Sequence, residues 1–407
     1  MKIEEAKKMI NYLLDNNLDL VKNGQYKIAI GLEGAPGIGK TAIVKELAEE
    51  RGAKFVRVEL SSMEEIGDLI GIPIKEFLMR TSIPAESEDG EGLEYIETWV
   101  SEKMVDEYLN LGYSLCRDCQ PRMSYAIPSW VPQDPNEEVL LLLDDYTRAT
   151  NLFMQAIMSL IQFGEYISWK LPEKTHLILT SNEDNGSMNV TSLDSAQQSR
   201  LLNFHLDFDY EQYGKWMDRC NLKSEAINFM LLHPEIFDQS DRVNARTYTM
   251  FANAISGFKS FNNIETLDSI DLIAKGCFGN DTTIGALFVT FIHNNLDKLM
   301  SAEEMLDGDW ADTSKKIKEN VTKDGQYRAD IASVLTMRLV NYIEMNGKDS
   351  KKADKAVKRV EEIINHNEIL LTEDLIYNLI KKMVKNFPGK CQKMLLNPKV
   401  RTKVLGR

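Results

Sequence analysis

The chain has 407 residues, with 48 Lys and Arg against 62 Asp and Glu, and its formal net charge at pH 7 is −14. A chain of this length rarely folds around one core, so we expect two or three domains. A hydrophobic fraction of 43% excludes a largely disordered protein. The acidic balance argues against coating nucleic acid or an anionic membrane with the whole surface, so any basic contact must be local.

The sequence predicts neither a secretory signal nor a membrane span. Acids stand at positions 4 and 5, where a signal peptide has a basic and then an apolar stretch. The longest apolar runs, such as residues 139–143, are far shorter than the roughly 20 residues that cross a bilayer. Five dispersed cysteines do not indicate a disulfide framework. We therefore expect a reduced, cytoplasmic protein without a membrane partner.

The first 24 residues predict an amphipathic helix, because Ile3, Ile10 and Leu14 recur at helical spacing before Asn23-Gly24. From residue 25 to 209, short apolar runs alternate with helical stretches. This is the pattern of buried parallel strands with helices on both faces of the sheet. The runs are residues 28–32, 55–58, 139–143 and 176–180. We expect an α/β fold, an αβα sandwich with a parallel central sheet.

Residues 75–137 separate the second and third runs and are rich in Pro, Gly, Ser and aromatic residues. They are too many for an ordinary loop, so we predict an insertion with its own helices and a function. After about Tyr210 the strand signals stop. We expect residues 210–262 to form a small helical lid and residues 263–407 an all-helical C-terminal domain.

One segment has the chemistry of a phosphate site. The P-loop pattern Gly-x4-Gly-Lys-Thr is matched by Gly34-Ala35-Pro36-Gly37-Ile38-Gly39-Lys40-Thr41. Its glycines let successive N–H groups point at a polyphosphate, and the helix that begins near Lys40 presents its partly positive end to the same anion. Lys40 would contact the β- and γ-phosphates, and the Thr41 hydroxyl would bind Mg²⁺. The segment predicts a site for a nucleotide and Mg²⁺ in a P-loop NTPase.

The third apolar run ends in two acids, Asp144 and Asp145. An acid at the tip of a buried strand in the same sheet as a P-loop is placed to hold Mg²⁺, and we assign this role to Asp144. We predict that Asp145 activates the attacking water, although it is one methylene shorter than the more common Glu.

With these motifs in this order, the chain resembles the AAA+ ATPases, and within them the MoxR-like, dynein-related branch (AAA_5), most closely those encoded by bacterial viruses. The resemblance covers roughly residues 5–260. Residues 163–172 resemble the β-hairpin that precedes sensor 1 in this branch, and residues 180–182 resemble sensor 1 itself. The resemblance makes Asn182 the residue that orients the attacking water, and it places the branch's helix 2 insertion in residues 75–137.

Two arginines follow from the same resemblance. Residues 193–200 are similar to the family's run that ends in the arginine finger, here Arg200. Residues 244–247 resemble the sensor 2 motif, with Arg246 as its arginine, although the family usually has Pro where Ala245 stands. A P-loop alone neutralises only part of the charge on a γ-phosphate, and an arginine from a neighbouring subunit supplies more.

The resemblance implies a nucleotide-binding hydrolase, an ATPase that cleaves the phosphoanhydride bond at the subunit interfaces of a homo-oligomeric, hexameric ring. It also implies a chaperone-like activity that remodels or assembles an unidentified protein client. The setting would be the bacterial cytoplasm or a virus-infected bacterial cell.

Two other functions remain open. Residues 351–407 carry 14 Lys and Arg against 6 Asp and Glu. This asymmetry is either a solvated helical face or a docking surface, and the latter favours a clamp-loader-like or other nucleic-acid-associated ATPase. The short Asp145 favours a slow nucleotide-dependent switch.

Two further signals are ambiguous. The Cys116 and Cys119 pair has the spacing of metal ligands but lacks a second pair, and the alternative is a redox pair, although no thioredoxin-like context surrounds it. Four aromatic residues of the insertion and hairpin either grip a polypeptide or anchor a loop, and they are Trp99, Tyr125, Trp130 and Trp169.

Overall fold

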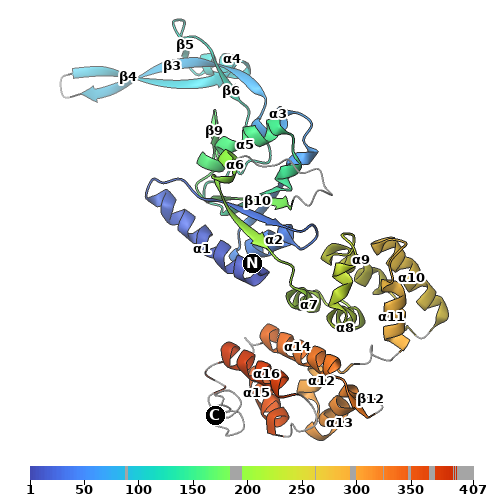
Figure 1. Ribbon diagram of the computed structural model, residues 1–407. Helices are drawn as coiled ribbons and strands as arrows, with labels where there is room; N and C mark the ends of the chain where they lie inside the picture. Colours follow the sequence, from blue (N-terminus) through green and yellow to red (C-terminus); the bar gives the residue numbers. More distant parts are fainter. Residues whose placement is uncertain are drawn as a thin grey trace. The chain divides into compact units, whose positions relative to one another are not determined.

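A computed structural model describes residues 1–87, 90–183, 195–261, 263–293, 299–323, 325–346, 350–365, 372–387, 389 and 391. The chain divides into two compact units, residues 1–208 and 209–407. Figure 1 labels many of their helices and strands.

The first unit is built on a five-stranded parallel sheet in the order β11-β1-β10-β7-β2. Its strands are β1 (Ala29–Gly34), β2 (Lys54–Glu59), β7 (Val139–Asp144), β10 (Thr175–Asn182) and β11 (Leu201–Leu206). The four strands expected from apolar runs are present. The fifth, β11, was not predicted, because this edge strand carries the polar residues Asn203 and His205 and is only partly buried. The α/β fold with a parallel central sheet is confirmed.

Helices cover both faces of this sheet because successive residues of a strand point to opposite sides. Leu140 and Leu142 belong to the apolar core beneath α1 and α2, whereas Leu141 and Leu143 belong to the core beneath α5. All four leucines are 0% exposed. The helices of this unit are α1 (Ile3–Lys22), α2 (Lys40–Arg51), α3 (Ile66–Ile70), α4 (Val105–Asn110), α5 (Asn151–Phe163) and α6 (Ser195–Gln198). Single 3-10 turns lie at η1 (Leu60–Ser62), η2 (Glu102–Met104) and η3 (Tyr146–Arg148).

His176 on β10 is a charge-sensitive position in this core. Its side chain is 0% exposed, and among the described residues neither ring nitrogen has a hydrogen-bond partner. Burial, with the nearby positive charges of Lys27 and Arg51, lowers the pKa of His176 to about 3. The folded protein therefore holds this imidazole neutral at pH values where an unfolded chain protonates it.

We expect acid to destabilise the fold through His176. The unfolded state binds one more proton than the folded state between pH 6.5 and about 3, so the free energy of unfolding falls as the pH drops through that window. At pH 4.5 the loss is about 2–3 kcal/mol. Denaturant unfolding at pH 7.5 and pH 4.5 should show a smaller loss for His176→Leu than for the wild type. The values at pH 7.5 isolate any packing effect of leucine, and equal pH dependence in both proteins would contradict this prediction.

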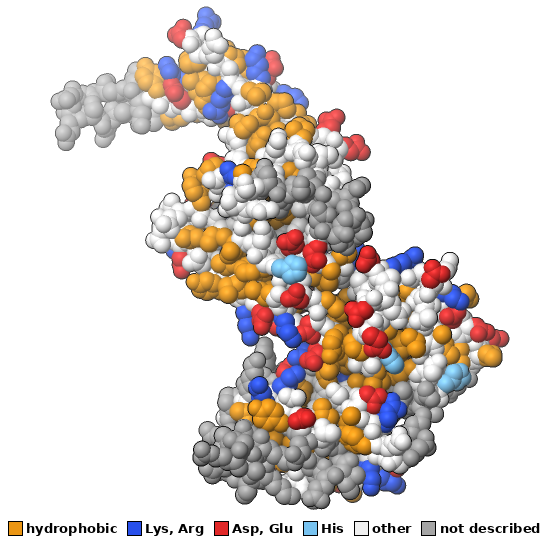
Figure 2. Space-filling view, in the orientation of Figure 1, with side chains coloured by type: hydrophobic (Ala, Val, Ile, Leu, Met, Phe, Trp, Pro, Cys, Tyr) orange, Lys and Arg blue, Asp and Glu red, His pale blue; other side chains and the backbone are white. Residues whose placement is uncertain are grey.

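The insertion between β2 and β7 is mainly an antiparallel arm. Its strands are β3 (Pro73–Ser87), β4 (Gly90–Ser101), β5 (Ser114–Leu115) and β6 (Arg122–Tyr125), and β3 pairs with the other three. The insertion has a helix of its own, α4, and the turn η2, as expected, but the strand pair that dominates its described residues was not predicted. β3 and β4 are rich in β-branched and aromatic residues, such as Ile74, Phe77, Tyr95 and Trp99, and these favour a strand pair that closes locally. On the face that Figure 2 shows, hydrophobic and charged side chains are interspersed over this arm.

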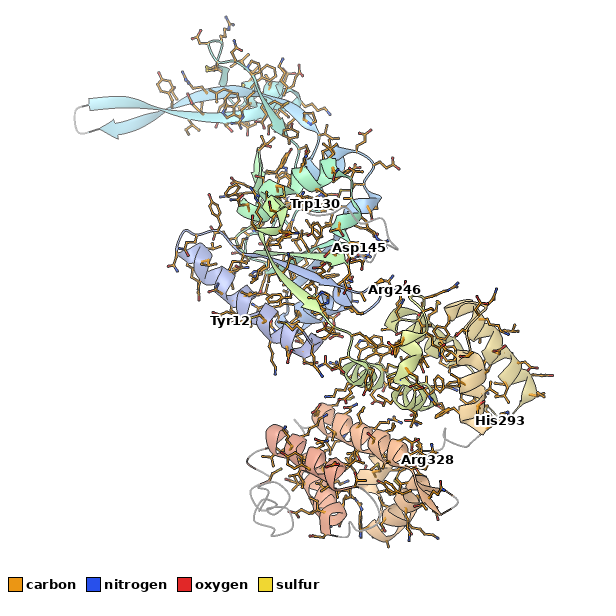
Figure 3. All side chains as sticks on the ribbon, in the orientation of Figure 1. Tyr12, Trp130, Asp145, Arg246, His293 and Arg328 are labelled. Atoms are coloured by element: carbon orange, nitrogen blue, oxygen red, sulfur yellow. A yellow bond between two sulfur atoms is a disulfide. The ribbon has the colours of Figure 1, made fainter. Side chains whose placement is uncertain are left out.

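Aromatic residues anchor the base of the insertion. The hairpin expected in residues 163–172 is present as β8 (Glu165–Tyr166) and β9 (Trp169–Lys170). The Trp169 indole donates to Ile70 O at 3.0 Å, and the Trp130 indole donates to Asp68 O at 3.1 Å. The two indole rings pack edge to face, with their centroids 5.8 Å apart. These contacts favour the anchoring interpretation for Trp130, which Figure 3 labels, and for Trp169.

The cysteines of the arm differ from the expectation of a fully reduced chain. Cys116 and Cys119 form a disulfide with their Cα atoms 5.4 Å apart, because the short turn after β5 brings them together. The other cysteines are not part of a disulfide, and they are Cys220, Cys277 and Cys391.

The second unit is mainly helical. Its helices are α7 (Tyr210–Arg219), α8 (Ser224–Leu232), α9 (Ala245–Ile255), α10 (Ile264–Phe278), α11 (Ile284–His293), α12 (Ala302–Asp307), α13 (Trp310–Val321), α14 (Ala329–Asn346), α15 (Ser350–Asn365) and α16 (Glu373–Asn386), with a 3-10 turn η4 (Pro234–Asp238). The expectation of helices throughout needs one correction. A two-stranded ribbon, β12 (Thr322–Lys323) with β13 (Gln326–Tyr327), follows α13 because the positive φ of Gly325 permits a tight reversal.

Aromatic packing joins α10 and α11 to the helices before them. Phe251 on α9 contacts Phe278 on α10 and Phe288 on α11, and Phe229 on α8 contacts Phe288. A separate apolar core joins α12 to α16. Both cores lie within one compact unit, residues 209–407, and the boundary expected after residue 262 stays a prediction. Among the described residues, no helix combines the length and apolarity needed to cross a bilayer.

Candidate functional site

The candidate site lies at the carboxyl ends of the central strands. Gly34, the last residue of β1, is in register with Asn182 on β10, and Glu59 on β2 is in register with Asp144 on β7. In a parallel sheet these ends share one edge, so the P-loop and the acids after β7 meet there. The sequence assigned them to one site without knowing the strand order.

The P-loop glycines are needed for conformation and space. Gly37 and Gly39 have φ of 80° and 102°, in the region that favours glycine. A Cβ on Gly34 would lie 2.7 Å from the carbonyl oxygen of Leu206. The loop therefore passes tightly over β11 and runs directly into α2, which begins at Lys40.

Lys40 is almost fully buried at the centre of the site, with 6% exposure. Its Nζ donates to Gly34 O at 2.8 Å, to Ala35 O at 2.9 Å and to Asn182 Oδ1 at 2.8 Å. The ammonium group is thus positioned by the P-loop that it would serve. A phosphate oxygen would take the place of one of these acceptors.

Oxygen atoms that suit Mg²⁺ converge on Asp144, which is 5% exposed. The Thr41 hydroxyl lies 3.0 and 3.1 Å from the two carboxylate oxygens, and the Thr180 hydroxyl donates to Oδ1 at 2.5 Å. In the described part of the chain, no group of three His, Cys, Asp or Glu side chains could hold a metal alone. One carboxylate and one hydroxyl fit Mg²⁺, which takes few protein ligands and completes its shell with phosphate and water.

Asp145 is held in a backbone conformation that is unusual for a residue other than glycine, with φ of 48°. Its N–H donates to Thr180 Oγ1 at 3.0 Å, and its Oδ1 accepts from Asn182 Nδ2 at 3.0 Å. Asn182 therefore contacts both Lys40 and Asp145. The structure thus brings together Lys40, Asp144, Asp145 and Asn182.

Sequence reasoning missed Arg57, on the edge strand β2. Its Nε donates to Asp144 Oδ2 at 2.6 Å, and its Nη2 lies 3.3 Å from Glu59 Oε2. The hydrogen bond to Asp144 raises the pKa of Arg57. The available signal was an arginine one position before the end of the second apolar run.

The two other predicted arginines are not part of this hydrogen-bonded cluster. Arg200 follows α6, where its Nε donates to Gln162 Oε1 at 2.8 Å and its Nη1 to Ala196 O at 2.5 Å. Residues 193 and 194 of its motif lie outside the described residues. Arg246 is exposed on the first turn of α9, in the second unit, and Figure 3 labels it. Both roles stay predictions.

Comparisons with known proteins point to the same part of the chain. Residues 30–88 match the ATPase family associated with various cellular activities (AAA). A 70-residue stretch is 40% identical to the Lon protease of Fusobacterium nucleatum, covering 17% of this chain and 9% of that protein. Midasin of Giardia intestinalis is 23% identical over 238 residues, covering 55% of this chain and 4% of that protein. The chain thus spans less than a tenth of either relative, and the matched AAA segment contains the P-loop and β2.

Two solved structures of Thermotoga maritima RuvB mutants are also similar. One is 13% identical with a TM-score of 0.34, covering 75% of this chain and 77% of that chain. The other is 14% identical with a TM-score of 0.37, covering 77% of this chain and 84% of that chain. Because both scores are below 0.5, the fold is assigned from the strand order of this chain.

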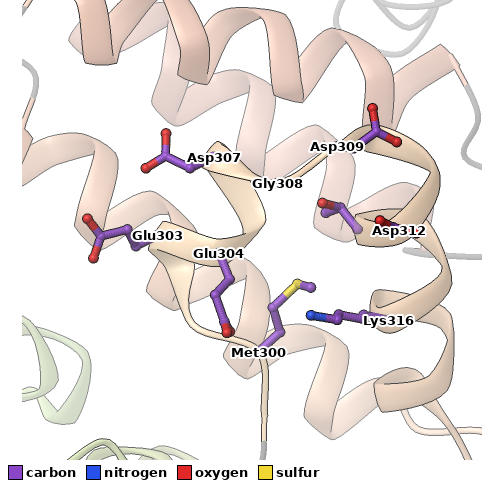
Figure 4. Close-up of a pocket in the computed structure, with 9 residues that line it drawn as sticks. Met300, Glu303, Glu304, Asp307, Gly308, Asp309, Asp312 and Lys316 are labelled. Atoms are coloured by element: carbon purple, nitrogen blue, oxygen red, sulfur yellow. The ribbon is translucent and has the colours of Figure 1, made fainter.

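A cavity of about 350 Å³ in the second unit is unrelated to the phosphate motif (Figure 4). It lies among α12, α13 and the residues before them. Three of its acids have structural partners: Glu304 accepts from Ser301 N, Asp309 caps α13, and Asp307 pairs with Lys355 at 2.8 Å. These partners account for three of the five acids in the lining.

Proposed function

We propose that the protein is a MoxR-like AAA+ ATPase of the kind that bacterial viruses encode, which hydrolyses ATP with Mg²⁺ at the subunit interfaces of a homo-oligomeric ring. It would use this reaction to remodel or assemble a protein client. One observation carries the proposal: Asn182 is hydrogen-bonded to both Lys40 and Asp145, beside the Thr41 and Asp144 pair. The match of residues 30–88 to the AAA family supports it.

Each residue has a role that its contacts allow. The P-loop amides and Lys40 would bind the phosphates, and Thr41 and Asp144 would hold Mg²⁺, which supplies charge neutralisation when bound. Asp145 would accept a proton from the attacking water. Its carboxylate is oriented by Asn182 and its backbone by Thr180, so little reorganisation is needed at the moment of reaction.

The ring completes the site. The γ-phosphate needs more positive charge than Lys40 provides, and Arg200 of the neighbouring subunit would supply it. Within its own chain, the hydrogen bonds of Arg200 described above go to the exposed residues Gln162 and Ala196. Arg200 can leave these partners at a modest cost in free energy. Arg246 would sense the nucleotide from the lid.

The nucleic-acid alternative receives less support. Several cations of residues 351–391 have partners on their own unit: Lys355 pairs with Asp307 at 2.8 Å, and Lys382 lies 4.0 Å from Glu211. These contacts reduce the positive surface available for a phosphate backbone. The slow nucleotide-dependent switch remains an alternative, because the Asp145 side chain is one methylene shorter than the more common Glu.

Calorimetry with Lys40→Ala tests the nucleotide site. We expect the affinity for Mg-ATP to fall by about 10- to 100-fold, because a charge-assisted hydrogen bond to phosphate is lost. The matched control is Lys45→Ala on the same helix, whose ammonium is exposed and 3.9 Å from Glu49. It should bind Mg-ATP as the wild type does. Absence of Mg-ATP binding to the folded wild-type protein would refute the proposed function.

A further inference from the structure

We propose that Arg57 is an internal counter-ion of Asp144 that competes with Mg²⁺, and that Glu59 receives the arginine when it leaves. Arg57 would then set the Mg²⁺ concentration at which the site loads nucleotide. The inference rests on the proposed Mg-ATP site and adds a positioning residue to it.

The first step is the occupancy of the Asp144 carboxylate. Oδ1 accepts from Thr180 at 2.5 Å, and Thr41 lies near both oxygens. Oδ2 accepts from Arg57 Nε at 2.6 Å, so a cation already occupies this carboxylate oxygen. Because the Asp144 side chain is only 6% exposed, a metal ion has little of the carboxylate left to approach.

The second step is the repulsion between Arg57 and Mg²⁺ at the Asp144 carboxylate. A guanidinium group and a divalent cation at the same carboxylate repel each other, and this repulsion is strong where solvent is scarce. Arg57 must therefore withdraw from Oδ2 before Asp144 can serve Mg²⁺, directly or through water. The free energy that holds Arg57 at Oδ2 sets the fraction of molecules in which Arg57 has withdrawn. The apparent affinity for Mg²⁺ is reduced in proportion to that fraction.

The third step is a place for Arg57 to go. Its side chain is 48% exposed, whereas that of its partner Asp144 is buried, so the arginine can move without disrupting the core. Glu59, two residues further along the same strand, lies 3.3 Å from Nη2 and is 44% exposed. Since residues i and i+2 of a strand share a face, Glu59 and Asp144 can exchange the guanidinium over a short distance.

A purely structural ion pair between β2 and β7 would have the same contacts but different consequences. Its loss would lower stability and leave the Mg²⁺ requirement unchanged. Competition instead predicts opposite shifts for the two partners of Arg57. Removing Arg57 should lower the Mg²⁺ concentration needed for nucleotide binding. Removing the charge of Glu59 should raise it, because Asp144 then becomes the main acceptor for the guanidinium of Arg57.

The test is the Mg²⁺ concentration that gives half-maximal binding of a fluorescent ATP analogue at fixed nucleotide concentration. For Arg57→Gln we expect this midpoint to fall about five- to tenfold, the effect of one partly exposed charge-assisted hydrogen bond. For Glu59→Gln we expect it to rise about two- to threefold. The control is Arg80→Gln on the arm, where an exposed arginine pairs with Glu97, and its midpoint should equal that of the wild type.

Circular dichroism and thermal unfolding establish that each variant is folded. If Arg57→Gln does not fold, Arg57→Lys replaces it, and its midpoint should lie below that of the wild type because one ammonium group cannot contact both carboxylates. An unchanged or raised Mg²⁺ midpoint in the folded Arg57 variant, or a lowered midpoint in Glu59→Gln, would overturn the inference. The proposed function would still stand in that case if the wild type binds the nucleotide in the presence of Mg²⁺. If the wild type binds no nucleotide at any Mg²⁺ concentration, the proposed function and this inference both fail.

Discussion

Replacing Arg200 with alanine is expected to lower the ATP turnover number by on the order of 10³- to 10⁵-fold, while binding of Mg-ATP changes little. The reason is that the arginine would stabilise charge only in the transition state, from the neighbouring subunit. The wild-type specific activity should also rise with protein concentration as subunits assemble. The matched control is Gln162→Ala, which removes the resting partner of Arg200 and should leave turnover within a few-fold of wild type.

Mixed assemblies make this test sharper. Arg200→Ala and Asp145→Asn subunits are each expected to be inactive alone. In a mixture, an interface forms in which one subunit provides Asp145 and the other provides Arg200, so part of the activity should return. If the Arg200→Ala protein keeps full ATPase activity and the wild-type activity does not depend on protein concentration, the site is complete within one chain.

Replacing Asp145 with asparagine is expected to lower turnover by about 10²- to 10⁴-fold, the usual contribution of a general base. Asparagine keeps the size of the side chain and an oxygen that can accept from Asn182, so nucleotide affinity should stay close to that of the wild type. Single-turnover hydrolysis and equilibrium binding measure the two quantities separately.

The same position separates the ATPase from the slow switch. If the missing methylene limits catalysis, Asp145→Glu should hydrolyse ATP faster than the wild type. If Asp145→Asn has the same turnover as the wild type, no catalytic base exists at this position, and the switch becomes the better account. The Asp145→Asn protein should also retain a bound client, which a pull-down can identify.

Several features followed from the sequence because they depend on local patterns. The residue types and spacing of Gly34 to Thr41 predict a phosphate-binding loop, and its backbone conformation and helix start are local properties that the structure has. The apolar run ending in Asp144 and Asp145 predicted a buried strand, which the structure has as β7. The same reasoning failed where tertiary packing decided the outcome: the arm became a strand pair, and the edge strand β11 had no continuous apolar run.

What the sequence by itself determined is the inventory of the site, namely a P-loop, two acids and an asparagine after a later strand. Only the tertiary structure decided which of them touch. Lys40 and Asn182 are 142 residues apart, and Arg57 and Asp144 are 87 apart, yet each pair is hydrogen-bonded. These contacts follow from the order β1-β10-β7-β2, which places strands that are far apart in the sequence side by side. No local pattern contains that order, and so Arg57 became visible only in the folded chain.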